Sequence, residues 1–277
     1  MALVLIRGAG DVGSAVAHRL FSAGHSVVIH DVVRPAHARR GMAFSDALFE
    51  DRCTLAGVLG KRVSDLPALP LMARCGRAVP LTDLQFGAAL DCIRPQVLVD
   101  ARMRKREVPE SQCALALLTI GLGPNFRAGV NAHRVIETAW GTALGEVIES
   151  GASLPLAGEP RPIDGLGRQR FVTAHIDGLF VTTRRIGERV EAGEAIAHIA
   201  SAATQSAVLT APISGCLRGL VHTGAVVRAG DKVIEIDPRA DPGLVVGLGE
   251  RPAFIADGVL KAIAKAGLSV SGQPSHD

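Results

Sequence analysis

The sequence predicts an α/β fold in two parts, a Rossmann-like parallel-sheet domain followed by a C-terminal β barrel-sandwich hybrid. Three observations carry this prediction. The turn GAGDVG at 8–13 joins an apolar strand to an amphipathic helix. Apolar strands then alternate with helical stretches over the first half of the chain, which favours a parallel sheet with crossover helices. In the second half, residues 175–199 align without gaps with residues 212–236, at an offset of 37.

The first half contains short apolar runs separated by segments with apolar residues at helical spacing. Its glycines, prolines and capping residues mark the boundaries between them. The strands are expected at 3–7, 26–31, 78–81, 96–102 and 116–123. The helices are expected at 12–23, 42–50, 81–93 and 130–150.

The glycine turn has the order strand, Gly8-x-Gly10-x-x-Gly13, helix, which is typical of a dinucleotide-binding turn. Gly8 permits the tight turn, Gly10 lets a phosphate approach the backbone, and Gly13 lets the helix pack on the sheet. Asp31 ends the second strand, where a ribose-binding acid is expected. Asp11 argues against an ordinary site, because a carboxylate there caps the helix and repels a pyrophosphate.

Basic residues follow Asp31 closely, and they leave the choice between NAD and NADP open. They are Arg34, Arg39 and Arg40. The turn is therefore interpreted as a site for a nucleotide or a pterin phosphate, with an unoccupied turn as the alternative.

Composition divides the chain further. A Rossmann-like domain is expected over 1–152, a linker rich in proline and glycine over 153–169, and the β domain over 170–238. A C-terminal segment, 239–277, carries a helix at 254–267. The repeat resembles biotinyl/lipoyl-type domains, but its central hairpin contains no lysine, so we expect no biotin or lipoyl attachment.

Composition and charge exclude several classes of protein. The net charge is +3, aromatic residues make up 3% and tyrosine is absent, which argues against nucleic-acid binding. No apolar run reaches the roughly 18 residues of a membrane span. The five cysteines are scattered and odd in number, which indicates a cytoplasmic protein without a metal site built on cysteine.

Other candidate site residues lie at the carboxyl ends of predicted strands, where ligands bind in parallel sheets. Asp100 and Arg102 end one strand, and Lys105 and Arg106 follow in the run RMRKR. A second glycine-rich connection contains Gly121 and Gly123. His133 and Glu137 are four residues apart on a predicted helix, where they could act as acid and base or as two metal ligands, with a plain i,i+4 pair favoured. Together with Asp100 they are the catalytic candidates; no metal site is predicted.

Six segments, taken in order, resemble the selenium-dependent molybdenum hydroxylase system (YqeB-like) family, which is distantly akin to xanthine dehydrogenase accessory factors. The segments are IRGAGDVGSAVAHRLFSAGHSVVI, RRGMAFSDALFE, VLVDARMRKRE, IGLGPNFRAGVNAHRVIETAWGTALGEVI, APISGCLRGL and FIADGVLKAI. The resemblance covers roughly residues 3–264. The family turn reads more like GDLATG, where this chain has GDVGSA.

The resemblance implies an accessory factor in maturation or cofactor loading of a molybdenum-containing hydroxylase. Its crevice would bind a nucleotide or the phosphate of the molybdenum cofactor, with Arg102, Lys105 and Arg106 neutralising the anion. The expected partners are the client enzyme or other maturation proteins, and exposed sheet edges favour a homodimer. The alternatives are an NAD(P)-dependent oxidoreductase that uses His133 as acid, and a non-catalytic module whose ligand controls association with a client.

Overall fold

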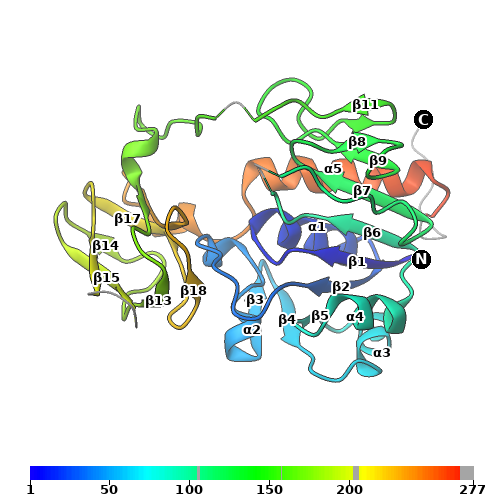
Figure 1. The fold of residues 1–277 in the computed structure, drawn as a ribbon, viewed down its shortest axis with the longest axis horizontal. Coiled ribbons are helices and arrows are strands. Elements are labelled where there is room, and N and C mark those ends of the chain that lie inside the picture. Colours follow the sequence, from blue (N-terminus) through cyan, green and yellow to red (C-terminus); the bar gives the residue numbers. More distant parts are fainter. Residues whose placement is uncertain (105–106, 157, 202–205, 269–277) are drawn as a thin grey trace.

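A computed structural model describes residues 1–104, 107–156, 158–201 and 206–268. A large mixed sheet with its covering helices forms one body, and two small antiparallel sheets form a second body beside it (Figure 1). No helix in these ranges is both long enough and apolar enough to cross a membrane.

The large sheet has nine strands in the order β10-β9-β7-β6-β1-β2-β5-β4-β3. Its seven central strands run parallel, whereas β10 and β3 are antiparallel edges. The strands are β1 Leu3–Arg7, β2 Ser26–His30, β3 Arg52–Leu55, β4 Val58–Arg62, β5 Val79–Thr82, β6 Val97–Asp100, β7 Leu118–Leu122, β9 Arg134–Ile136 and β10 Val147–Ile148.

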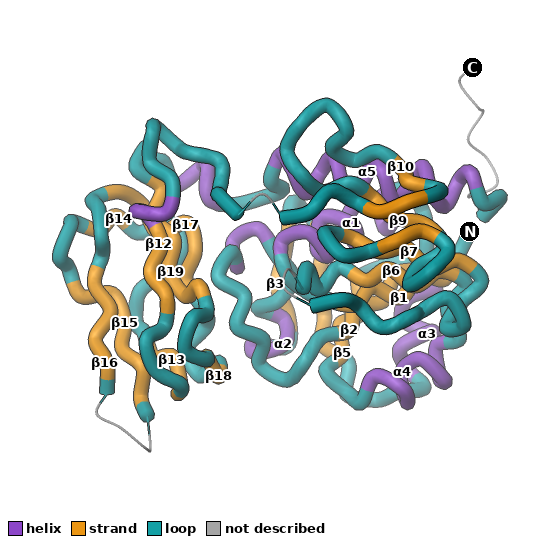
Figure 2. Tube along the Cα trace, turned by 45° about the horizontal axis from the view of Figure 1, so that its top comes forward, coloured by secondary structure: helices purple, strands orange, loops and turns teal. Residues whose placement is uncertain are grey.

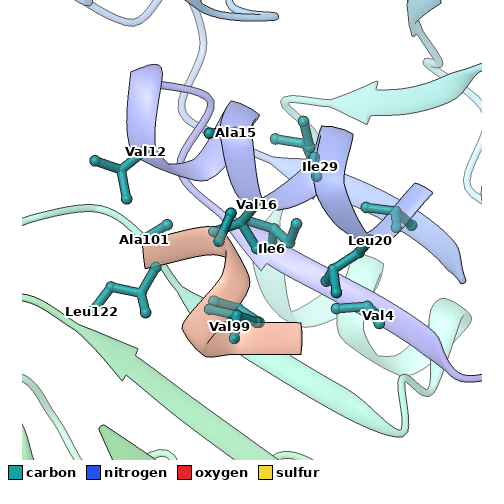
Figure 3. Packing of buried hydrophobic residues seen from close by; sticks show 14 of the residues in the cluster. Val4, Ile6, Val12, Ala15, Val16, Leu20, Ile29, Val99, Ala101 and Leu122 are labelled. Carbon is teal, nitrogen blue, oxygen red and sulfur yellow. The ribbon is translucent and has the colours of Figure 1, made fainter. Parts of the chain in front are cut away.

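Helices cover both faces of this sheet, so its central strands are apolar on both sides. Val4 and Ile6 of β1 pack under α1 and α5 (Figure 3). Leu3 and Leu5 face α3 and α4. The alternation follows the two-residue period of a strand. The helices are α1 Asp11–Ser22, α2 Ala47–Glu50, α3 Ala68–Cys75, α4 Phe86–Ile93 and α5 Glu250–Lys265. The expected C-terminal helix is confirmed, and it lies along α1.

The second body consists of two four-stranded antiparallel sheets, β12-β19-β17-β14 and β16-β15-β13-β18, around a shared apolar core (Figure 2). Its strands are β12 Phe171–Thr173, β13 Gly178–Val181, β14 Arg189–Val190, β15 Ala195–Ala200, β16 Ala207–Thr210, β17 Gly215–Leu220, β18 Val226–Val227 and β19 Lys232–Asp237. A two-stranded sheet joins β8 Arg127–Ala128 to β11 Gly151–Ala152.

The internal repeat is confirmed by two equivalent glycines. A Cβ on Gly178 would lie 2.4 Å from the carbonyl oxygen of Ala200, and a Cβ on Gly215 would lie 2.4 Å from that of Asp237. Gly178 and Gly215 are 37 residues apart in the sequence, and so are their neighbours Ala200 and Asp237. At each position a strand therefore passes too close for any side chain.

The predicted fold class is wrong. The large sheet is mixed, with antiparallel strands at both edges, in place of the expected Rossmann-like parallel sheet. The second body forms two four-stranded antiparallel sheets, in place of the expected barrel-sandwich hybrid. Residues 130–150 form β9 and β10, not helices. Gly141 and Gly145 explain this difference, since both adopt positive φ, 148° and 83°, which interrupts a helix.

Candidate functional site

A row of polar residues crosses the carboxyl edge of the large sheet. Arg7 is in register with His30 on one side and with Asp100 on the other. His30 is in register with Thr82, and Asp100 with Gly121. In an α/β sheet this edge is where ligands bind.

Arg7 and His30 project onto the face that carries α4. The Arg7 guanidinium lies 3.8 Å from the ring centroid of Phe86, and the His30 ring meets the same phenyl edge-on at 5.2 Å. The alternation of β1 puts Leu5 and Arg7 on one face, which explains the placement. Phe86 thus provides an apolar floor for two polar side chains.

Glu110 bridges three arginines at this edge. Its Oε1 accepts hydrogen bonds from Arg7 Nη1 at 3.0 Å and Arg102 Nη2 at 2.8 Å. Its Oε2 accepts one from Arg104 Nη2 at 2.7 Å. The Glu110 side chain is 49% exposed, whereas Arg7 is 11% exposed. Partial burial opposes ionisation, but the hydrogen bonds from Arg102 and Arg104 hold the pKa of Glu110 well below its usual range.

Asp100 and Gln112 hold Arg102 in place. Asp100 Oδ1 accepts from the Arg102 backbone N–H at 3.1 Å and from Arg102 Nε at 2.9 Å. Gln112 Nε2 donates to the other oxygen at 2.6 Å. Asp100 is 1% exposed, and although its burial raises the pKa, these bonds lower it overall. Asp100, a predicted catalytic candidate, therefore positions an arginine.

Close backbone packing requires glycine at two positions of the glycine turn. Gly8 has a φ of +113°, and its N–H donates to the carbonyl of His30 at 2.8 Å. A Cβ on Gly13 would lie 1.9 Å from the Gly8 carbonyl oxygen. The expected reasons for glycine at both positions are confirmed.

Carboxylates of the chain itself occupy the turn. Asp31 Oδ2 accepts from the Ala9 N–H at 2.6 Å, and Asp11 Oδ1 accepts from the Val12 N–H at 3.0 Å. His37 Nε2 lies 2.7 Å from Asp31 Oδ2. The His37 ring also covers Gly10, since a Cβ there would lie 3.2 Å from Nδ1. Two of the backbone N–H groups that could hold a phosphate at this turn thus already donate to carboxylates of the chain.

The basic residues after Asp31 face the second body. Arg39 pairs with Asp11 and Glu235, and Arg40 pairs with Asp46 and donates to the carbonyl of Leu220. Burial lowers the pKa of Arg39, but the two carboxylates raise it overall. Arg39 and Arg40 thus serve the contact between the bodies.

The second glycine-rich connection is explained by packing. A Cβ on Gly121 would lie 2.2 Å from the Phe126 ring. Gly123 has a φ of +108°, and a Cβ there would lie 3.3 Å from Met103 Sδ. The Ser153 hydroxyl donates to the Gly123 carbonyl at 2.7 Å. These glycines let side chains pack on the strand end.

His133 and Glu137 are not brought together as an acid–base pair. His133 Nδ1 accepts from the Thr119 N–H at 3.0 Å. Glu137 is 3% exposed, and its carboxylate accepts backbone N–H bonds from Thr138, Ala139 and Leu154. Both residues organise backbone near β9. The predicted anion ligands Lys105 and Arg106 lie outside the described residues.

Sequence reasoning did not single out Arg7, His30, His37, Glu110 or Gln112. Arg7 and His30 carry a usable signal, since each is a polar residue that ends an apolar strand. Glu110 carries none, because its contact with Arg7 spans 103 residues of sequence. Within the described part of the chain, no group of three His, Cys, Asp or Glu residues is arranged to hold a metal ion.

No family model matches the sequence. The chain is 35% identical over 262 residues to "Uncharacterized protein YqeB" of Escherichia coli (strain K12), covering 94% of this chain and 47% of that protein. This supports the YqeB-like part of the resemblance. The chain spans about half the length of this curated relative, which is itself uncharacterized.

Solved structures of acylase-type proteins also align with the chain, at low similarity. A succinylglutamatedesuccinylase/aspartoacylase from Rhodobacter sphaeroides is 14% identical, covers 79% of this chain and 61% of its own, and has a TM-score of 0.24. The ectoine utilization protein EutE (DoeB) from Ruegeria pomeroyi is 10% identical, with coverages of 85% and 52% and a TM-score of 0.24. A succinylglutamate desuccinylase from Silicibacter sp. TM1040 is 14% identical. The alignment covers 85% of this chain and 84% of that chain, with a TM-score of 0.27.

The predicted function is corrected. The chain was expected to be a maturation factor for a molybdenum hydroxylase that binds a nucleotide or molybdopterin phosphate at the glycine turn. In the structure, Asp31 and Asp11 accept hydrogen bonds from backbone N–H groups of that turn and the His37 ring covers Gly10, which argues against a phosphate there.

Proposed function

We propose that this protein binds a small carboxylic acid at the carboxyl edge of its large sheet. The carboxylate of the ligand would be held by Arg7, Arg102 and Arg104, in the place that the Glu110 carboxylate occupies. The observation that carries this proposal is the contact of one half-exposed carboxylate with three guanidinium groups at 3.0, 2.8 and 2.7 Å.

The arginines are held in position before a ligand arrives. Arg7 stacks on Phe86, and Arg102 is fixed by Asp100. Arginine presents a planar fork of donors that matches the two oxygens of a carboxylate. A site whose donors are already ordered loses less conformational entropy on binding.

The charges in the cluster favour an anion. Once Glu110 has moved away, three arginines stand against Asp100 and the exposed Glu107, whose carboxylate lies 3.6 Å from Arg104. The guanidinium groups of Arg7 and Arg102 both donate to Oε1 of Glu110, and burial and the nearby Arg102 lower the pKa of Arg7. Arg7 Nε is buried without a hydrogen-bond partner among the described residues. When Glu110 leaves, the arginines need another carboxylate.

The test is a titration with propionate, followed by amide NMR shifts, on the wild-type chain and on Glu110→Gln. The internal carboxylate competes with the ligand in the wild type, so Glu110→Gln should bind propionate about tenfold more tightly. Arg7→Met, added to Glu110→Gln, should abolish that gain. Glu107→Gln is the matched control, because Glu107 lies on the same loop, is 68% exposed and lies 3.6 Å from Arg104.

Two results would overturn the proposal. One is the absence of propionate binding to Glu110→Gln at millimolar concentration. The other is propionate binding that is the same with and without Arg7. A parallel titration with inorganic phosphate tests the chemical class, and tighter binding of phosphate than of propionate would contradict a carboxylate site.

A further inference from the structure

His30 shares the floor of the arginine cluster. It is in register with Arg7 on the neighbouring strand, and both side chains contact Phe86. Neighbouring strands lie about 4.8 Å apart. The His30 ring and the Arg7 guanidinium group, which would hold a bound carboxylate, therefore lie on the same face of the sheet and against the same phenyl ring.

The hydrogen bonds of His30 fix its tautomer. Nε2 lies 2.8 Å from the carbonyl oxygen of Leu84, which can only accept, so Nε2 carries the proton. Burial lowers the pKa of His30, and the charges of Arg7 and Arg102 lower it further against the opposing effects of Leu84 and Asp31. In this tautomer Nδ1 presents a lone pair.

Nδ1 has no hydrogen-bond partner among the residues that the structure describes, although the other ring nitrogen is bonded. The cluster beside it contains three arginines whose donors are directed at a carboxylate. A hydrogen-bond acceptor on the His30 ring thus shares the Phe86 floor with a set of anion-binding donors. A ligand that satisfies both needs a carboxylate and, close to it, a hydrogen-bond donor.

Resting on the carboxylate site proposed above, we infer that the ligand is a hydroxycarboxylic acid whose hydroxyl group donates to Nδ1 of His30. An amino acid has a donor in the same place, but its ammonium group would be repelled by Arg7, Arg102 and Arg104. A keto acid presents an oxygen lone pair to the lone pair of Nδ1. A hydroxyl group donates without adding positive charge.

The test uses four acids of three carbons on the Glu110→Gln chain: lactate, propionate, alanine and pyruvate. Lactate should bind about tenfold more tightly than propionate, and alanine and pyruvate should bind no better than propionate. In His30→Phe, lactate should fall to the affinity of propionate, while propionate keeps its own. His18→Phe is the matched control, because His18 Nε2 also lies near a carbonyl oxygen, that of Ala56 at 3.2 Å, on an exposed part of α1.

A pH series separates hydrogen bonding from packing. Protonation of Nδ1 removes its lone pair, so the preference for lactate over propionate should disappear as the pH falls through the pKa of His30. The charged groups that affect His30 are Arg7, Arg102 and Asp31. A merely structural role of His30 would leave this preference unchanged.

The outcomes distinguish the two proposals. Equal binding of lactate and propionate overturns the hydroxyl assignment and leaves the carboxylate site standing. An equal loss of both acids in His30→Phe also overturns it, because His30 would then only support the cluster. If no acid binds to Glu110→Gln, the carboxylate site itself fails.

Discussion

Arg39 and Glu235 form a two-point ion pair that joins the two bodies of the protein, with Nε–Oε2 and Nη2–Oε1 distances of 3.0 Å each. Glu235 lies on β19 and is fully buried, and it also pairs with Arg170 at 2.6 Å. The remaining nitrogen of Arg39 donates to Asp11 at the start of α1. The glycine turn and the small sheets are thus held by one guanidinium group.

Glu235→Gln should destabilise the protein by about 3–5 kcal/mol, because it leaves buried cations without a compensating charge. Urea unfolding would measure the change. Glu159→Gln is the control, since Glu159 is 75% exposed and pairs with Arg168 at 3.0 Å. This variant should lower the free energy of unfolding by no more than about 1 kcal/mol. Equal stabilities of the two variants would contradict a structural role for the buried carboxylate.

Gly13→Ala should lower the free energy of unfolding by about 1–3 kcal/mol. The new Cβ would lie 1.9 Å from a carbonyl oxygen that cannot move without opening the turn. Gly87→Ala in α4 is the control. Its Cβ would meet the flexible Gln85 side chain at 3.2 Å, and a helical alanine gains about 0.5–1 kcal/mol over glycine. The urea midpoints should move in opposite directions, and a shared direction would count against the close packing at Gly13.

Local patterns predicted most of the first body. The helix after the glycine turn, the strand that ends near Asp31 and the C-terminal helix each follow from apolar spacing over neighbouring residues. The helices predicted over 130–150 do not form, because Gly141 and Gly145 adopt positive φ angles that interrupt a helix. The hairpin of β3 and β4 was also missed, since Gly60 and the charged residues there weaken the strand pattern.

The site was predictable only in part. Asp100 and Arg102 were expected at a strand end, and the structure places them there. The residues that contact them in the structure are distant in the sequence or lie in loops without a recognisable pattern. Glu110 reaches Arg7 across the sheet edge, and His37 reaches back over the glycine turn to Asp31. These contacts depend on how loops return to the sheet, and periodicity carries no information about that.

Glu137→Gln should cost about 1–3 kcal/mol of stability, because the amide group can no longer accept three backbone N–H bonds at once. It should leave the affinity for propionate unchanged, since Glu137 is not part of the arginine cluster. Glu149→Gln is the exposed control, with its partner Lys265 at 3.2 Å. A loss of propionate binding in folded Glu137→Gln would return this residue to the list of functional candidates.

The His37–Asp31 pair makes stability depend on pH in a defined direction. Burial lowers the pKa of His37, but the charge of Asp31 and their hydrogen bond raise it overall. A raised histidine pKa stabilises the folded state fully below the unfolded value of about 6.5, and this contribution is lost as the pH rises through the folded pKa. His37→Gln should therefore reduce the difference in unfolding free energy between pH 6 and pH 9. Urea unfolding at a series of pH values checks this, with His18→Gln as the exposed control, and parallel pH curves for His37→Gln and the wild type would show that the pair does not contribute.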